Sequence, residues 1–346
     1  MNFTKILIHW YSVNKRDLPW RRTKNPYYIW LSEIIMQQTQ IKQGLPYYEA
    51  FVTNFPTVFD LANADEQDVL KLWQGLGYYS RARNLHASAK YVVNELNGEF
   101  PSTYIGLIKL KGVGDYTASA ISSICFDESH AVVDGNVYRV LARYFGIDTP
   151  INSTPGIKEF KALATKLLDT SNPGDYNQAV MEFGATQCKP KNPYCIVCPL
   201  KDSCIALQKG KVYDLPLKLK KTKVTKKHFN FLVLISEDKK TVFEQRTEKG
   251  IWQNLYQFPL IESDNEIDSE LFTNHPQIKD YFKTSEFSSS VYNPDPIIHK
   301  LSHQHLFTKF WIIEVKRLEM EGISISEVKN YPTPILISNF IDAFGF

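Results

Sequence analysis

Apolar residues recur at three- and four-residue spacing through the first two thirds of the chain, with polar residues between them. This spacing places the apolar side chains on one face of a helix. Short joints that contain glycine or proline separate the periodic stretches, so several helices are predicted instead of one long helix. The predicted helices cover residues 29–40, 66–76, 83–96, 117–124, 137–144 and 157–168.

The pattern changes near residue 228, where short runs of branched and aromatic residues begin. Runs of this composition and length predict β-strands. They cover residues 228–236, 241–246 and 308–315. The change indicates that an α+β domain follows an all-helical one.

Six lysines lie between residues 218 and 227, next to this change of pattern. A run of like charges repels itself and favours an exposed tether, although lysines can also contact nucleic-acid phosphates. The predicted organisation is a helical domain at residues 1–211, a basic linker at 212–227 and an α+β domain at 228–346.

The composition restricts the classes of protein to which the chain can belong. With 43% hydrophobic residues in 346, the chain can bury two cores and is not disordered. The 40 basic and 37 acidic residues nearly cancel, so any surface for nucleic acid must be local. The sequence contains no apolar stretch of membrane-spanning length and no signal peptide at residues 1–20, which predicts an intracellular protein.

Four of the five cysteines, Cys188, Cys195, Cys198 and Cys204, follow the spacing C-x6-C-x2-C-x5-C. Four thiolates in one short loop can hold a zinc ion or a [4Fe–4S] cluster, and the spacing alone leaves both open. Disulfides are less favoured because nothing else in the sequence suggests a secreted disulfide framework. The fifth cysteine, Cys125, lies in an apolar run and is predicted to be a buried core thiol.

Three further motifs accompany the cysteines. They are W-L-S-E-I-I-M-Q-Q-T-Q at residues 30–40, L-K-G-V-G-D-Y-T at residues 110–117 and A-V-V-D-G-N-V at residues 131–137. Together with the cysteine spacing, they resemble the endonuclease III family of DNA glycosylases, in the branch of the MutY-type adenine DNA glycosylases. The resemblance extends over nearly the whole chain. It implies a helix-hairpin-helix glycosylase domain, with the hairpin motif at about residues 104–124 and a [4Fe–4S] cluster in the loop at 188–204.

Two carboxylates are the candidate catalytic residues. Glu33 lies in an otherwise apolar helix, where burial would raise its pKa and make it a proton donor near neutral pH. Asp134 precedes a glycine at a predicted helix start. The residues alone favour ordinary roles, an exposed glutamate and an N-cap. The resemblance implies instead that Glu33 protonates adenine and that Asp134 stabilises the positive charge at C1′ of the sugar.

Tyr116 and Asn136 are the candidate supporting residues. Family members that also cut the strand have a lysine at the position of Tyr116, which attacks C1′ and forms a Schiff base. A phenol cannot do this, so the resemblance implies base removal without efficient strand cleavage. Tyr116 is expected to form a hydrogen bond near Asp134, or to serve as a core aromatic residue. Asn136 is expected to orient Asp134 or a water molecule.

The candidate DNA contacts lie in two glycine-containing turns and near them. Gly112 and Gly114 allow a tight hairpin before a helix whose first N–H groups can bind a phosphate, although an ordinary turn between helices has the same pattern. The resemblance implies that Tyr78 wedges into the duplex beside the partner base. Further residues are expected to fill space or bind phosphates, unless they only pack or carry solvated charge. These are Arg21, Gln38, Leu76 and Arg81.

The C-terminal part carries a further resemblance. The run G-I-W-Q-N-L-Y-Q-F-P, from Gly250 to Pro259, resembles the Nudix-like domain of MutY-type enzymes. The R-E-x-x-E-E run that binds magnesium in Nudix hydrolases is absent from the sequence, so nucleotide hydrolysis is not expected. The run Leu301-Ser302-His303 resembles a loop that senses 8-oxoguanine. A serine hydroxyl can accept a hydrogen bond from the N7–H of that base. Leu301 replaces the usual aromatic residue, and the alternative for this run is a polar β-turn.

These features predict a monomeric, cytoplasmic and nucleoid-associated DNA repair enzyme with a [4Fe–4S] cluster. It is expected to flip adenine mispaired with 8-oxoguanine or guanine out of double-stranded DNA and to remove it by hydrolysis. The alternatives are a pyrimidine-lesion glycosylase with lyase activity, a non-catalytic mismatch-binding protein and a nucleotide-pool hydrolase. The tyrosine at position 116 argues against the lyase. The presence of both Glu33 and Asp134 argues against the binding protein, and the missing glutamate run argues against the nucleotide hydrolase.

Overall fold

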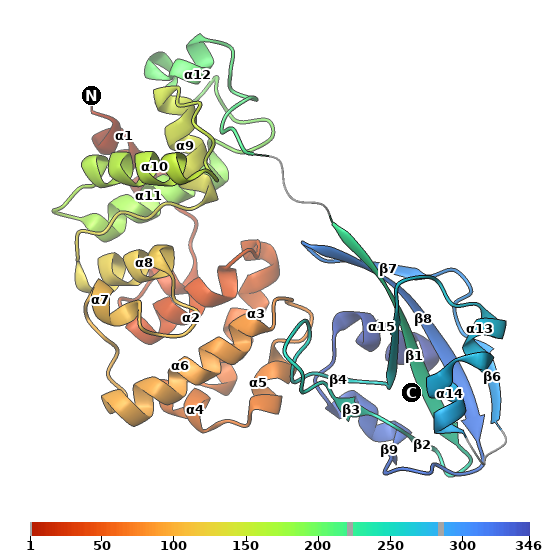
Figure 1. Cartoon of the computed structure of the whole chain (residues 1–346). Coiled ribbons are helices and arrows are strands. Elements are labelled where there is room, and N and C mark those ends of the chain that lie inside the picture. Colours follow the sequence, from red (N-terminus) through yellow and green to blue (C-terminus); the bar gives the residue numbers. More distant parts are fainter. Residues whose placement is uncertain (1, 220–223, 283–286) are drawn as a thin grey trace. The chain divides into compact units, whose positions relative to one another are not determined.

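The computed structural model describes residues 2–219, 224–282 and 287–346 (Figure 1). The chain divides into two compact units. One consists of Met1–Ala64 with Arg83–Lys220, and the other consists of Asp65–Ala82 with Lys221–Phe346. The second unit therefore includes a short segment from the part of the sequence that is otherwise helical.

Helices build the first unit. They are α1 (Phe3–Asn14), η1 (Pro19–Arg21), α2 (Pro26–Met36), α3 (Ile41–Asn54), α4 (Val58–Asn63), α7 (Tyr104–Leu107), α8 (Asp115–Phe126), α9 (Gly135–Phe145), α10 (Thr154–Leu167), α11 (Pro173–Thr186), η2 (Lys201–Ser203) and α12 (Ile205–Gln208). Helix α6 (Ser80–Leu96) begins in the second unit and continues into the first. No helix in the described ranges is long and apolar enough to cross a membrane.

Local sequence explains where the helices nearest the site begin and end. Helix α2 begins after Asn25, whose side chain accepts a hydrogen bond from the N–H of Tyr27, and Pro26 occupies the first helical position, where an N–H is not needed. Helix α9 begins after Asp134 and ends at Gly146, whose φ of +68° favours glycine.

Close packing between α8 and α11 holds the segment that leads to α9. Asn177 of α11 is fully buried and donates to Ser123 Oγ of α8 at 2.9 Å and to the carbonyl of His130 at 2.8 Å. Its Oδ1 accepts from the N–H of Val132 at 3.1 Å. Because these bonds satisfy both ends of the Asn177 amide, the chain just before Asp134 is fixed to the core.

A mixed sheet forms the centre of the second unit. Strands β1 (Thr225–Ser236) and β8 (Gln304–Val315) are parallel and pair along their whole length. The strands that pair antiparallel with them are β5 (Leu260–Ser263) on β1, and β6 (Phe287–Val291) and β7 (Ile297–Lys300) on β8. Two smaller sheets pair β2 (Lys240–Thr241) with β9 (Ile323–Ser324), and β3 (Glu244–Gln245) with β4 (Tyr256–Gln257).

Helices cover both faces of the central sheet, so its two long strands are largely buried (Figure 1). On one face, Phe310 stacks on Phe340 of α15 (Ile335–Phe344) with ring centroids 4.0 Å apart. On the other face, the next residue, Trp311, stacks on Phe272 of α13 (Ser269–Asn274) at 3.9 Å. The remaining helical elements of this unit are α5 (Glu66–Leu72), α14 (Pro276–Tyr281) and η3 (Ile325–Asn330).

The predicted combination of an all-helical part and an α+β part is confirmed, and all six predicted helices occur with shifted ends. The prediction of a single strand at 241–246 is wrong. Its two ends belong to different small sheets, and Val242 and Phe243 between them are both buried. A continuous strand would have placed these neighbours on opposite faces.

The predicted linker includes residues 220–223, which lie outside the described residues. Before them, Leu215 is buried and its carbonyl accepts a hydrogen bond from Arg143 Nε at 3.1 Å. After them, Lys226 and Lys227 are exposed residues of β1. The boundaries at residues 211 and 228 stay a prediction.

Gly174→Ala should destabilise the chain because a Cβ there would lie 2.7 Å from the carbonyl oxygen of Ser123 and 2.9 Å from Cα of Ile124. Backbone cannot move aside cheaply, so we expect a loss of about 1–3 kcal/mol in the free energy of unfolding, measured by denaturant titration. The control is Gly135→Ala, where the added Cβ meets nothing within 4 Å. Equal effects of the two substitutions would contradict this packing.

Candidate active site

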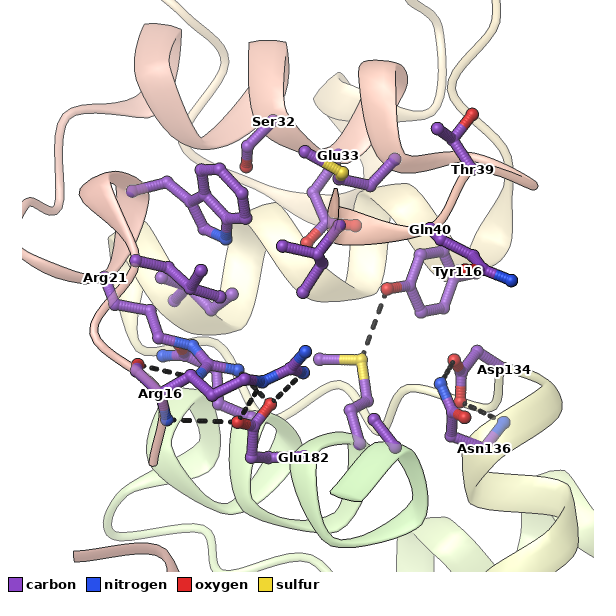
Figure 2. A pocket seen from close by; sticks show the side chains of 18 of the residues that line it. Arg16, Arg21, Ser32, Glu33, Thr39, Gln40, Tyr116, Asp134, Asn136 and Glu182 are labelled. Atoms are coloured by element: carbon purple, nitrogen blue, oxygen red, sulfur yellow. Dashed lines mark hydrogen bonds and ion pairs between the residues drawn. The ribbon is translucent and has the colours of Figure 1, made fainter. Parts of the chain in front are cut away.

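A cavity of about 580 Å³ lies within the helical unit. Figure 2 shows side chains from α2, α8, α9 and α11 lining it, together with the turn that carries Arg16 and Arg21. Three carboxyl groups line this cavity, and they belong to Glu33, Asp134 and Glu182. Their surroundings differ, which gives each a different tendency to hold a proton.

Glu33 comes from α2, a helix in which the neighbouring residues Leu31, Ser32, Ile34 and Ile35 are all buried. The Glu33 side chain is partly buried and lines the cavity. Burial raises the pKa of its carboxyl to about 7, although a hydrogen bond with Tyr116 lowers it in part. This carboxyl can therefore carry a proton near neutral pH, which is the role that the family resemblance implied and not the exposed glutamate that the residues alone favoured.

Tyr116 comes from the first turn of α8 and lies beside Glu33 in the cavity wall. Burial raises its pKa well above the usual value, and the charge of Glu33 raises it further. The hydroxyl also lies 3.2 Å from the sulfur of Met181. It therefore stays protonated and can donate a hydrogen bond to a carboxylate.

Asp134 is the N-cap of α9, as the residues alone predicted. Its Oδ1 accepts hydrogen bonds from the backbone N–H of Asn136 at 2.9 Å and of Val137 at 2.8 Å. The second oxygen, Oδ2, accepts from Asn136 Nδ2 at 2.7 Å, which is the orienting contact predicted for Asn136. Burial raises the pKa of Asp134, and these three hydrogen bonds oppose that rise because they favour the charged form.

Arg139 supports this pair from behind. Its Nη2 donates to Asn136 Oδ1 at 2.8 Å and to the carbonyl of Gly184 at 2.6 Å, and its Nε donates to the carbonyl of Cys188 at 2.8 Å. A chain of hydrogen bonds thus runs from the Cys188 backbone through Arg139 and Asn136 to Asp134.

Glu182 forms the opposite wall with two arginines. The carboxylate is 1% exposed and accepts from Arg16 at 2.6 Å through each oxygen and from Arg21 Nη2 at 2.7 Å. Burial alone would raise the pKa of Glu182, but the hydrogen bonds from Arg16 and Arg21 outweigh it and lower the pKa to about 2. Glu182 therefore stays charged at neutral pH, where the Glu33 carboxyl is protonated in part of the molecules.

Sequence reasoning missed Glu182 and Arg139. A signal for Glu182 was present, because it lies in the largely apolar run A-V-M-E-F-G-A at residues 179–185, the same pattern that singled out Glu33. Arg21, predicted to contact the pocket or DNA phosphates, lies in the cavity wall and pairs with Glu182.

The predicted hairpin lies at the start of α8. Gly112 has a φ of +80°, and a Cβ there would be 3.0 Å from Cβ of Asn84, so the turn needs glycine. Gly114 is the N-cap of α8 and is exposed. The side-chain amide of Gln37 donates to the carbonyl of Gly112 at 3.2 Å, which joins the end of α2 to the hairpin.

The second predicted turn lies in the other unit. Tyr78 is 49% exposed and has a φ of +48°, whereas Leu76 is buried. Arg81 is also buried; its Nη2 donates to the carbonyl of Gly77 at 3.2 Å, and its guanidinium lies over the ring of Trp73. This placement does not favour the predicted phosphate contact of Arg81. Gln38, in the first unit, is exposed with a φ of +56°.

The four clustered cysteines line one small cavity of about 30 Å³, whereas Cys125 lies elsewhere and is partly buried. Arg143 donates to Cys188 Sγ at 3.4 Å. Within the described ranges, no three His, Cys, Asp or Glu side chains form a group suited to a single metal ion. A [4Fe–4S] cluster takes one thiolate on each iron, so a set of four cysteines that line one cavity fits it.

The predicted lesion loop is the tip of the hairpin between β7 and β8. Ser302 and His303 are exposed there, with Ser302 Oγ 3.4 Å from His303 Nδ1. The N–H of Leu301 donates to the carbonyl of Gln304 at 2.9 Å and closes the turn. The backbone of this tip is thus a β-turn, and its polar side chains face solvent.

Comparison with known proteins gives matches over both parts of the chain. A model of the HhH-GPD superfamily of base excision DNA repair proteins matches residues 31–167, and a NUDIX domain model matches residues 230–343.

Two relatives and one solved structure extend these matches. The chain is 38% identical to the adenine DNA glycosylase of Buchnera aphidicola subsp. Schizaphis graminum (strain Sg) over 258 residues, which is 74% of each protein. It is 36% identical over 317 residues to that of Buchnera aphidicola subsp. Baizongia pistaciae (strain Bp), covering 90% of this chain and 86% of the relative. The structure of a thermostable thymine-DNA glycosylase superposes with a TM-score of 0.55 at 29% identity, over 60% of this chain and 95% of that one.

Glu33→Gln should change the stability of the chain in a pH-dependent way. The pKa of Glu33 rises from 4.5 to about 7 on folding, so the native carboxyl destabilises the fold increasingly between these values as pH rises. We expect the substitution to raise the free energy of unfolding at pH 8 by up to about 3 kcal/mol relative to its effect at pH 4.

Denaturant titration at both pH values measures this difference. Glu182→Gln is the matched control with the opposite sign, because it removes a carboxylate that two arginines hold charged, and it should destabilise the chain at pH 8. A Glu33→Gln effect that is the same at both pH values would contradict the elevated pKa.

Proposed function

Because the chain belongs to the adenine DNA glycosylases, within the HhH-GPD superfamily of base excision DNA repair proteins, we propose that it removes adenine paired with 8-oxoguanine or guanine in double-stranded DNA. The enzyme acts on N-glycosyl bonds, and the predicted helix-hairpin-helix and Nudix-like folds are confirmed. The observation that carries the proposed mechanism is a protonatable carboxyl, Glu33, in the same cavity as a hydrogen-bonded one, Asp134.

Glu33 acts as the general acid. Adenine leaves poorly as an anion, and a proton on N7 makes it a neutral leaving group. The Glu33 carboxyl gives its proton to N7 while the bond between C1′ and N9 breaks, and the electron pair of that bond goes to N9. The pKa of about 7 supports this role, because the acid is protonated in a useful fraction of molecules at neutral pH.

Asp134 stabilises the positive charge that develops on the sugar. Three hydrogen bonds hold its carboxylate in one orientation, so little reorganisation is needed when the charge appears. A water molecule then adds to C1′ and loses a proton to the Glu33 carboxylate, which restores the acid. Tyr116 donates to Glu33 and offers no amine, so a Schiff base with C1′ cannot form and the strand stays intact.

The wall formed by Glu182 and Arg21 matches the edge of an adenine. The base presents ring nitrogens that accept hydrogen bonds, and the Arg21 guanidinium in this wall can donate to them. Glu182 already accepts hydrogen bonds from Arg16 and Arg21 on both oxygens, so it holds these arginines in place. The cavity is also large enough for a flipped base with room for water.

Of the remaining predicted residues, the exposed ones bind the DNA. The N–H groups after Gly114 bind a phosphate at the start of α8, and Gln38 and Tyr78 occupy the space that the flipped base leaves. Ser302 accepts from N7–H of 8-oxoguanine, with His303 beside it. Exposure of Tyr78, Ser302 and His303 in the structure supports these roles.

The four clustered cysteines hold a [4Fe–4S] cluster. When bound, this group would cross-link residues 188–204 through the four thiolates and give the loop a fixed shape. Arg139 and Arg143 bind the backbone of the same loop, so the protein contributes part of that shape itself.

Single-turnover excision on a duplex with one adenine opposite 8-oxoguanine tests the proposal. We expect strand breaks only after alkali treatment, because base removal leaves an abasic site that alkali cleaves. Breaks without alkali would reveal an amine nucleophile and contradict the role of Tyr116. Absence of product with either partner base, from protein loaded with iron, would refute adenine excision.

Asp134→Asn should bind the same duplex yet slow excision by about 10²–10³-fold, because a charged stabiliser is lost. Asparagine caps helices as well as aspartate does, so the fold of α9 is retained. Excision at the unmodified rate would refute the charge-stabilising role.

Cys198→Ser should lose bound iron, whereas Cys125→Ser should keep it, because only the former residue lines the four-cysteine cavity. Iron and sulfide analysis of the unmodified chain should give about four of each per chain. Zinc in place of iron would overturn the assignment of the cluster.

A further inference from the structure

The segment Asp65–Ala82 belongs to the same compact unit as the C-terminal residues, although it is far from them in sequence. Hydrogen bonds along α5 make this connection. Gln67 Nε2 donates to the hydroxyl of Tyr256 at 2.8 Å, and Lys71 Nζ donates to the carbonyl of Lys329 at 2.6 Å. The turn that follows α5 carries Tyr78.

Two side chains of this turn contact the backbone of a single residue, Thr333. The Tyr79 hydroxyl accepts from the N–H of Gly75 at 3.3 Å and donates to the carbonyl of Thr333 at 3.1 Å. Gln74 Oε1 accepts from the N–H of Thr333 at 3.2 Å, and Gln74 Nε2 donates to Ser338 Oγ at 2.9 Å. Both backbone groups of Thr333 are therefore bonded to the turn.

Thr333 offers a rigid support. It lies between Pro332 and Pro334, whose rings fix their φ angles and which carry no N–H. The N–H of Thr333 is thus the only backbone donor in this three-residue stretch, and Gln74 accepts its hydrogen bond. Thr333 is 2% exposed, and Pro334 is the N-cap of α15, so the support belongs to the core of the unit.

The turn itself needs such support. Gly75, Gly77 and Tyr78 have φ angles of +93°, +76° and +48°, and for Tyr78 this left-handed conformation is unfavourable. Tyr78 is 49% exposed, and the Arg81 guanidinium lies over its ring, 5.7 Å from the centroid. The hydroxyl of Tyr79 bonds both to the turn and to Thr333, which restrains Gly75 directly.

We propose that Tyr79 and Gln74 are positioning residues that clamp the Tyr78 turn to Thr333, so that the C-terminal part holds the tyrosine that enters the duplex. The proposal rests on the proposed function, in which Tyr78 is the wedge. It means that the wedge and the lesion loop at Ser302 belong to one unit, which reads the strand opposite the flipped adenine.

Hydrogen exchange in the full chain without DNA tests the clamp independently of activity. Tyr79→Phe removes only the hydroxyl and should speed exchange at the amides of residues 75–78 about tenfold, because their restraint is lost. Tyr256→Phe is the matched control, since it removes a tyrosine hydroxyl that also joins the two parts of this unit but bonds to Gln67 in α5 instead of to the turn. Unchanged exchange in Tyr79→Phe would overturn the clamp whether or not the protein excises adenine.

A double-mutant cycle then tests whether the clamp acts through the wedge. Single-turnover excision opposite 8-oxoguanine is measured for Tyr79→Phe and Gln74→Leu, each with Tyr78 intact and with Tyr78→Ala. We expect each variant to slow excision about fivefold to tenfold when Tyr78 is present and by less than about twofold when it is absent. Tyr256→Phe should be near the unmodified rate.

The outcomes separate the two proposals. Equal slowing with and without Tyr78 would show that the contacts act on the fold in general and would overturn the positioning role, as would faster exchange without slower excision. An unmodified chain that excises no adenine would refute the proposed function and the wedge with it, while the exchange measurement would still decide whether the clamp exists.

Discussion

The cost of taking a carboxylate out of water governs the helical unit. Two carboxyl groups that line one cavity, those of Glu33 and Glu182, respond to burial in opposite ways. Burial raises the pKa of Glu33 to about 7, so it can take up a proton near neutral pH, whereas Glu182 stays charged because two arginines surround it. Asp134 lies between these cases, since burial favours its proton and three N–H donors favour its charge. Groups that differ in this way within one pocket can serve as acid and as charge stabiliser in a single reaction.

The start of α9 combines a structural and a chemical role in one side chain. One oxygen of Asp134 caps the helix, and the other is oriented by Asn136, which Arg139 holds in turn. Because Arg139 also binds the carbonyl of Cys188, the cysteine loop and the cavity share a network of partly buried hydrogen bonds. Such networks are rigid when every member is satisfied, which suits a carboxylate that must stay in place.

The second unit shows that sequence order and compactness need not agree. Helix α5 and the turn after it precede most of the helical unit in sequence, yet they pack with residues near the C-terminus. Two prolines make the stretch around Thr333 stiff, and its remaining backbone groups are bound by Gln74 and Tyr79. The exposed Tyr78 is therefore held by residues that are more than 250 positions away.

The sequence by itself determined the two-part organisation, the main helices, the strands β1 and β8, and the candidates Glu33, Asp134 and the four cysteines. These features follow from local periodicity, from spacing and from motifs, all of which are written in consecutive residues. Tertiary structure decided what surrounds them. It brought Glu182 and Arg21 together from segments 161 residues apart, buried Arg81 against its own turn and joined Tyr79 to Thr333. It also divided residues 241–246 between two sheets, because strand pairing depends on distant partners. A side chain's pKa and exposure depend on such long-range contacts, and no local pattern encodes them.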